Sequence, residues 1–117
     1  MAIVDQPQTS LHPRDIRREM GLSREKMGYI MSVSAKTIEN WERQDALPAD
    51  EGKRNRLAAI AEMVRLGLLV YRAEGLSIFL QTPLRSLENH TPLQEIMAGH
   101  VERVIDVLAS EYEGLGF

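Results

Sequence analysis

Two prolines, Pro83 and Pro92, constrain the fold of this chain more than any other feature of its sequence. Each lacks a backbone N–H donor and pushes the preceding residue out of helical conformation, whereas proline is well tolerated as the first residue of a helix. The order of residues therefore predicts a helix that ends before Pro83, a compact turn, a short helix over 92–98, a stop at Gly99 and a further helix.

Leu84 and Leu87 are the apolar residues of the loop between these prolines, and we expect them to pack onto a core. This part of the chain resembles the C-terminal domain of the MbcA/ParS/Xre antitoxins, which binds toxins of the RES type. The residues that carry the resemblance are Phe79, Leu80, Pro83, Leu87, Pro92, Leu93, Ile96, Gly99 and Val104. The chain departs from the family pattern at Phe79, where tryptophan is usual, at Leu84 and at Glu88–Asn89.

Residues 22–48 carry the pattern of a helix-turn-helix. Ser23 and Ser34 are good N-caps for two consecutive helices. Gly28 stands where the second helix must cross the first closely, and Val33 is predicted to point inward from the turn. The pattern resembles the Xre-type (phage-repressor-like) helix-turn-helix, with matches at Leu22, Met27, Gly28, Met31, Val33–Ser34, Thr37–Ile38, Trp41–Glu42 and Pro48.

The second helix of such a unit lies in the DNA major groove, with its N-terminal residues at the base edges. Lys36 can donate to guanine, Asn40 can pair with adenine, and Ala35 or Thr37 can meet a thymine methyl group. The predicted DNA-binding residues are Ser34, Ala35, Lys36, Thr37, Asn40 and Arg43, with Arg24 and Lys26 before them. Of these, Arg43, Arg24 and Lys26 would hold phosphates, which position the protein without reading the sequence.

An alternative is that the helix-turn-helix serves only as a packing or dimerisation platform. The carboxylates of Glu39 and Glu42, on the same helix as the predicted base contacts, favour this alternative. An earlier helix, from about Pro13 to Gly21, carries three arginines whose face is either solvated or in contact with phosphate.

The rest of the chain also predicts helices. A polar connector over 45–55 leads to a long helix from Arg54, whose apolar residues recur at helical spacing as far as Tyr71 and cover more than one side. The pattern breaks over 72–75, a short amphipathic helix follows, and a last helix runs from Gly99 or His100 to Gly114. The predicted fold class is all-α, with a long central helix after the helix-turn-helix and a small C-terminal helical domain.

Gly114–Leu115–Gly116–Phe117 follows the last predicted helix. On its residues alone, such a tail is ordinarily frayed and idle. The resemblance to the antitoxins reverses this expectation, because it implies that the C-terminal end enters the toxin's NAD-binding cleft and excludes NAD with Leu115, Phe117 and the terminal carboxylate. The predicted toxin-binding residues are Phe79, Pro83, Leu84, Leu87, His90, Pro92, Arg103, Gly114, Leu115, Gly116 and Phe117.

The charge distribution, the length of apolar runs and the absence of cysteine limit the classes of function that this chain can have. The net charge is +1 over residues 1–56 and −4 over residues 57–117, which allows nucleic-acid contact at the N-terminal end and disfavours it at the C-terminal end. No apolar run reaches about 18 residues, so no membrane span is expected. The absence of cysteine excludes disulfides and thiol chemistry and agrees with a cytoplasmic protein.

No catalytic site, metal site or cofactor is expected. His12, His90 and His100 are scattered in the sequence and have no carboxylates at ligand spacing beside them. The glycines are isolated and form no phosphate loop, and nothing marks an activated serine.

The sequence therefore predicts a type II antitoxin with a lead-in over 1–10, a helix-turn-helix over 11–49 and a toxin-binding domain over 50–117. Its expected partners are a RES toxin that consumes NAD or ADP-ribosylates a target, operator DNA, a second copy in a homodimer, and larger hetero-oligomers with the toxin. The alternative is a stand-alone repressor with a C-terminal dimerisation domain. A third possibility is an adaptor without DNA activity.

Overall fold

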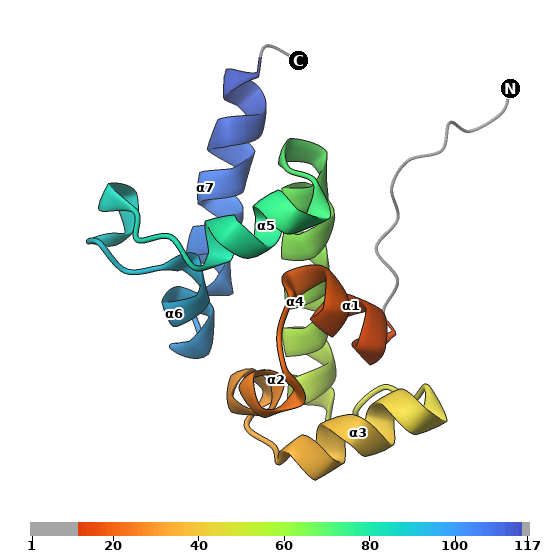
Figure 1. Cartoon of the computed structure of the whole chain (residues 1–117). Coiled ribbons are helices and arrows are strands. Elements are labelled where there is room, and N and C mark those ends of the chain that lie inside the picture. The colour runs from red at the N-terminus through yellow and green to blue at the C-terminus, as the bar shows by residue number, and fades with distance from the viewer. Residues whose placement is uncertain (1–11, 116–117) are drawn as a thin grey trace, which may run out of the picture.

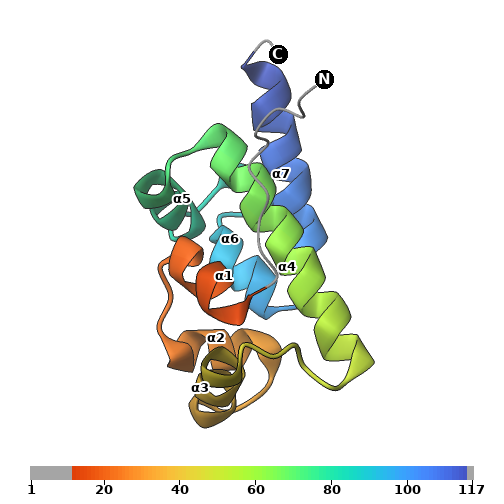
Figure 2. The same cartoon turned by 90° about the vertical axis from the view of Figure 1, so that its right-hand side faces the viewer.

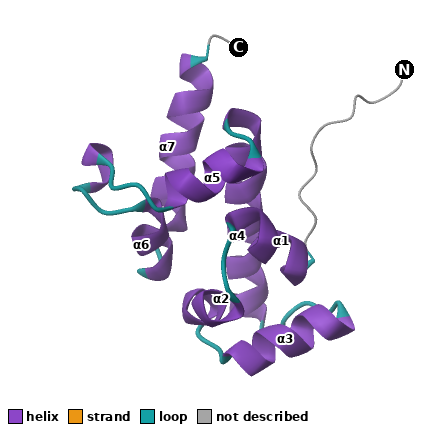
Figure 3. Cartoon of the chain, viewed as in Figure 1, coloured by secondary structure: helices purple, strands orange, loops and turns teal. Residues whose placement is uncertain are grey.

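The computed structural model describes residues 12–115, which form helices joined by short turns (Figures 1 and 3). Within these residues the only extended pairing is an isolated bridge between Leu84 and His90. The elements in chain order are α1 (Pro13–Met20), α2 (Arg24–Met31), α3 (Ala35–Gln44), α4 (Glu51–Val70), α5 (Ala73–Leu80), the 3-10 turn η1 (Arg85–Leu87), α6 (Pro92–Met97) and α7 (Val101–Gly114). The predicted all-α class is confirmed, and the predicted lead-in over 1–10 lies outside the described residues.

Helix α4 is the axis on which the other helices pack. Helix α7 lies beside α4, and the α2–α3 unit gathers at the N-terminal end of α4 (Figures 1 and 2). Helix α1 packs against both α4 and α5, so the N-terminal part of the chain contacts the C-terminal part directly. Helix α3 and the C-terminal end of α7 lie at opposite ends of the molecule (Figure 1).

Helix α4 begins earlier than its apolar pattern predicts. The side chain of Asp50 accepts a hydrogen bond at 2.9 Å from the backbone N–H of Lys53 and caps a helix that starts at Glu51. The predicted connector over 45–55 is therefore wrong in its second half. A solvent-facing first turn has no apolar residues and leaves no periodic signal, so only its cap could have marked it.

The predicted break over 72–75 is also wrong in part, because Ala73 to Gly75 form the first turn of α5. Helices α4 and α5 approach closely at Gly67, where a Cβ atom would lie 2.6 Å from Leu76 Cδ1. The rings of Tyr71 and Phe79 stack beside this contact, with centroids 5.2 Å apart.

One hydrophobic cluster joins the two parts of the chain. Its fully buried members come from α1, α2, α3, α4, α5, α6 and α7, and they include Ile16, Met20, Met27, Ile30, Met31, Ile38, Leu57, Ile60, Met63, Val64, Leu76, Leu80, Ile96, Val104 and Leu108. Burial of side chains of this size contributes about 1.5–3 kcal/mol each against conformational entropy. Among the described helices, none is long and apolar enough to cross a lipid bilayer.

Candidate functional site

The geometry of a helix-turn-helix is present at α2 and α3. A Cβ atom at Gly28 would lie 2.6 Å from the carbonyl oxygen of Val33, so only glycine lets the turn pass this close to α2. Ser34 Oγ accepts a hydrogen bond at 3.1 Å from the backbone N–H of Thr37, and Ser23 caps α2 in the same way. The predictions for both caps, for Gly28 and for the inward position of Val33 are confirmed.

The predicted DNA-binding side chains of α3 share its outer face. Lys36 and Arg43 are exposed, whereas Ala35, Thr37 and Asn40 are half-buried. Their polar tips are paired along the helix at a spacing of three residues, which places side chains next to one another. Ser34 Oγ lies 3.1 Å from Thr37 Oγ1, Lys36 Nζ lies 3.3 Å from Glu39 Oε1, and Arg43 Nη2 donates to Asn40 Oδ1 at 2.8 Å.

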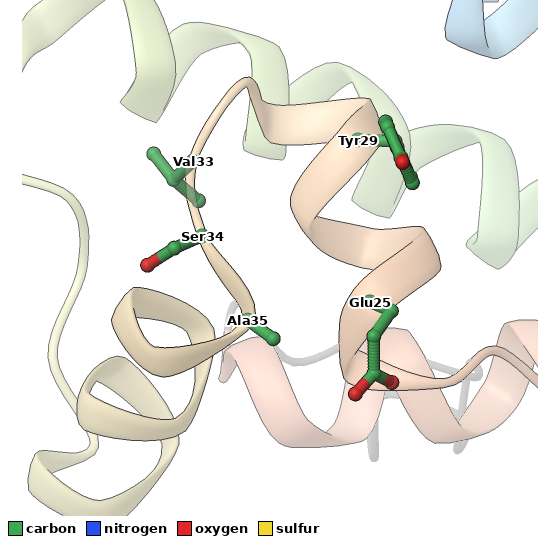
Figure 4. A pocket seen from close by; sticks show the side chains of 5 residues that line it. All are labelled: Glu25, Tyr29, Val33, Ser34 and Ala35. Atoms are coloured by element: carbon green, nitrogen blue, oxygen red, sulfur yellow. The ribbon is translucent and has the colours of Figure 1, made fainter.

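A shallow hollow of about 230 Å³ lies where α2 meets the start of α3 (Figure 4). Glu25 and Tyr29 line it from α2, Val33 and Ser34 line it from the turn, and Ala35 lines it from the start of α3. Tyr29 is 77% exposed, and Glu25 has no ion-pair partner within residues 12–115. The hollow therefore places an aromatic ring and a negative charge beside the N-terminus of α3.

A buried ion network fixes α3 against α1 and α2. Glu42 is only 5% exposed. It accepts hydrogen bonds from Arg17 Nε at 2.5 Å, Arg17 Nη2 at 3.0 Å and Arg24 Nε at 3.2 Å. Arg17 Nη1 also donates to the carbonyl oxygen of Leu22 at 3.0 Å. The charge of Glu42 therefore does not favour the packing-platform alternative, because two arginines neutralise it inside the protein.

The ion network bears on the predicted phosphate contacts of two arginines, Arg17 and Arg24. Arg17 is committed to Glu42, so the expectation of a solvated or phosphate-contacting α1 face does not hold for it. Arg24 is 42% exposed, and a phosphate contact there would compete with its bond to Glu42. Burial alone raises the pKa of Glu42, but the hydrogen bonds and charges of Arg17 and Arg24 outweigh burial and hold that pKa below its ordinary value.

Some cations remain available at this end of the molecule. Lys26, Arg43 and Arg14 are exposed and have no carboxylate partner within residues 12–115. Arg14 and Arg43 line one hollow of about 420 Å³ between α1 and the end of α3, together with His12, Asp15, Glu42 and Asp45. The mixture of charges around it makes this surface nearly neutral rather than strongly basic.

The predicted toxin-binding residues divide by exposure. Phe79, Leu87 and Pro92 are buried, so their side chains support the surface from within and do not face a partner. Leu84 and Arg103 are half-buried; Pro83, His90, Gly114 and Leu115 are exposed; and Gly116 and Phe117 lie outside the described residues. The exposed and half-buried members keep their predicted role as a hypothesis.

The proline-bounded loop (residues 83–92) is closed on itself and projects beside α6 and α7 (Figure 1). The backbone N–H of Leu84 donates to the His90 carbonyl at 3.0 Å, and that of Asn89 donates to the Leu84 carbonyl at 2.8 Å. Leu87 is buried, and half-buried Leu84 packs against the hydrophobic cluster, as predicted. Glu88 and Asn89 have φ angles of 53° and 65°, a conformation that side-chain-bearing residues adopt at a cost.

Glu95 is a residue that the sequence analysis missed. Its side chain is 4% exposed and accepts hydrogen bonds from His90 Nδ1 at 2.8 Å, Arg103 Nη1 at 3.0 Å and His100 Nδ1 at 3.3 Å. Arg103 Nη2 extends the network to both carboxylate oxygens of Glu88, at 3.0 and 3.1 Å. Arg103 therefore forms ion pairs while remaining partly exposed, and the network ties the proline-bounded loop to α6 and α7.

Glu95 also corrects the view that the histidines are scattered and lack a neighbouring carboxylate, because it brings His90 and His100 together. Within residues 12–115, however, no group of three or more potential ligands is arranged to hold a metal ion. The hydrogen bond from His90 lowers the pKa of Glu95 against the opposing effect of burial, and Arg103 and His100 lower it further. The inward position of Glu95, between Leu93 and Ile96 on a short helix, was the signal available in the sequence.

The C-terminal end of α7 leads into the predicted tail. Tyr71 Oη donates to Glu111 Oε2 at 2.5 Å and holds this end of α7 against the end of α4. Burial, and then the hydrogen bond to Glu111, raise the pKa of Tyr71 to about 12. Helix α7 ends at Gly114 as predicted, and Leu115 is 52% exposed.

No protein-family model matches this sequence, and no curated protein matches it significantly. Comparison with solved structures gives a chain of the crystal structure of the M. tuberculosis MbcT–MbcA toxin–antitoxin complex. The two chains are 20% identical and superpose with a TM-score of 0.73, over 88% of this chain and 92% of that chain. This chain therefore has the fold of a chain of that complex, and the resemblance predicted from the sequence is confirmed at the level of the fold.

Proposed function

We propose that this chain is the antitoxin of a toxin–antitoxin pair and that it inhibits a RES toxin by occupying the toxin's NAD-binding cleft. The fold shared with a chain of the MbcT–MbcA complex, over nearly the whole length of both chains, is the observation that carries this proposal. The mechanism is steric, so it requires no catalytic group, metal or cofactor from this chain.

The C-terminal surface supports the proposal through its rigidity. The proline-bounded loop is fixed by the buried Leu87 and by the bonds of Arg103 to Glu88 and Glu95. A surface that is ordered before binding loses less conformational entropy on association. Exposed Pro83 and half-buried Leu84 offer apolar contact there, while Leu115 begins the tail that would enter the cleft.

The test is co-expression with the neighbouring gene, which we expect to encode the toxin, with cellular NAD as the measured quantity. Full-length protein should preserve NAD, whereas a chain that ends at Glu113 should not. The matched control is Tyr29→Ala, which removes a large exposed side chain at the opposite end of the molecule and should leave NAD protected. Protection by the truncated chain would refute the role of the tail, and absence of a complex with the full-length chain would refute the antitoxin.

We further propose that the α2–α3 unit binds operator DNA and represses the chain's own operon. The caps, the close approach at Gly28 and the outward face of α3 support this function. Two half-sites bound by a dimer would strengthen binding, because the second contact is made at high effective concentration. Binding to the upstream DNA should be lost in Lys36→Ala and Asn40→Ala, and unchanged binding in both would instead support the alternative that the helix-turn-helix serves only as a packing or dimerisation platform.

A further inference from the structure

Arg43 and Asn40 form the best-defined polar pair on the outer face of α3. Arg43 Nη2 donates to Asn40 Oδ1 at 2.8 Å. A guanidinium group can only donate hydrogen bonds, so the atom of the amide that faces it must be the carbonyl oxygen. The bond therefore selects one of the two flipped orientations that an asparagine side chain otherwise adopts.

This orientation matters for base recognition. With Oδ1 turned toward Arg43, the amide nitrogen of Asn40 points away from the guanidinium group and offers two N–H donors. The carbonyl oxygen retains a second lone pair. Asparagine reads adenine by donating to N7 and accepting from N6, which requires both atoms of the amide in one orientation.

The neighbouring candidate, Lys36, is arranged differently. Its ammonium group lies 3.3 Å from the Glu39 carboxylate, so a contact with guanine would have to compete with an opposite charge. Arg43, by contrast, has no carboxylate partner within residues 12–115 and uses one of its nitrogens on a neutral amide. The guanidinium group thus keeps its full charge, and its other nitrogens, for a DNA phosphate.

We infer that Arg43 is a positioning residue for base recognition by Asn40, and not only a phosphate contact. This inference rests on the proposed operator binding. Its signature is a loss of sequence preference at the single base pair that Asn40 reads. Replacement of a residue that only holds phosphate weakens binding to all sequences alike and lowers the salt dependence of binding by about one phosphate contact.

The test begins with selection of bound sequences from a pool of random duplex DNA by the full-length wild-type protein. Dissociation constants are then measured for the selected duplex and its single-base variants. Asn40→Ala identifies the base pair that this residue reads, where about a 5- to 150-fold preference is expected to disappear. Arg43→Ala should reduce the preference at the same base pair by about two- to fivefold, the lower part of the range for a typical intramolecular hydrogen bond, because this bond is exposed.

Arg14→Ala is the matched control, since it removes an exposed arginine from the hollow that Arg43 also lines. This variant should bind all duplexes more weakly by the same factor and should keep the base preference of the wild-type protein. In the double variant Asn40→Ala/Arg43→Ala, the two effects on preference should not add, because both act on one contact. Arg43 is exposed, and thermal unfolding of each variant verifies that the fold is retained.

A uniform loss of affinity in Arg43→Ala, equal to that in Arg14→Ala, would overturn the inference while leaving operator binding in place. So would an Asn40→Ala variant that keeps every base preference. If the wild-type protein selects no sequence at all, operator binding itself fails and the positioning role of Arg43 fails with it.

Discussion

Replacement of Glu42 by glutamine should destabilise the whole protein, because Glu42 joins three helices through a buried charge. Its carboxylate accepts three hydrogen bonds from two arginines, and its side chain has no exposed surface. Glutamine has nearly the same shape but only one acceptor oxygen. Its amide nitrogen would face an arginine N–H, so two donors would oppose each other and the charge of Arg17 would lose its partner.

The magnitude follows from the burial of the arginines. Removing one partner of a fully buried ion pair costs about 3–5 kcal/mol. Arg17 retains 14% exposure and its bond to the Leu22 carbonyl, and Arg24 is 42% exposed, so both are partly compensated by solvent. We therefore expect Glu42→Gln to lower the free energy of unfolding by about 2–4 kcal/mol.

Denaturant unfolding of the full chain measures this loss. The matched control is Glu39→Gln on the same helix, which removes a carboxylate that is 41% exposed and pairs with Lys36 at 3.3 Å. The control should lose less than about 1 kcal/mol. Equal losses in the two variants would refute the conclusion that the Glu42 network organises the helix-turn-helix.

The pH dependence of stability provides a second check on the same variant. Because the pKa of Glu42 lies below its ordinary value, the ionised network stabilises the protein above the unfolded pKa of about 4.3. This contribution is lost as pH falls from there through the lower pKa of the folded protein. Glu42→Gln should therefore show a shallower loss of stability in acid than the wild-type protein.

Three further predictions concern other parts of the fold. Gly28→Ala should lower the stability by about 1–3 kcal/mol in thermal unfolding, because its Cβ would meet the Val33 carbonyl oxygen, whereas Gly114→Ala meets open space and should cause no loss. The raised pKa of Tyr71 stabilises the folded wild-type protein below pH 10.0, and this contribution is lost as the pH rises to about 12. Tyr71→Phe lacks the contribution, so its free energy of unfolding should fall less over this pH range. Arg103→Ala should make amide hydrogen exchange in the proline-bounded loop several-fold faster, and unchanged exchange would show that the loop needs no tether.

Local signals in the sequence were sufficient for most of the fold. Pro83, Pro92, the two serine caps and Gly28 each act on neighbouring residues, so their effects could be predicted without knowledge of tertiary contacts. The helical spacing of apolar residues in α4 and α7 identified the faces that are buried. The errors at the start of α4 and α5 arose in first turns that face solvent, where no apolar spacing exists.

The candidate surfaces were predicted less completely, because charged side chains choose partners far away in the sequence. Arg17 meets Glu42 across 25 positions, and Arg103 meets Glu88 across 15. No periodicity encodes these pairs, so the sequence could not show which arginines form ion pairs within the protein and which remain available to a partner. Glu95 was missed for a different reason: its partners are near in the sequence, but its inward position on α6 was not recognised.

The continuous core, which draws on every α-helix within residues 12–115, has a consequence for the lifetime of the protein in a cell. Small domains with one core generally unfold in a single cooperative step. The two outer surfaces, at opposite ends of the molecule, are therefore present together or absent together. In the proposed role, global unfolding followed by proteolysis would therefore end promoter repression and toxin inhibition at the same time.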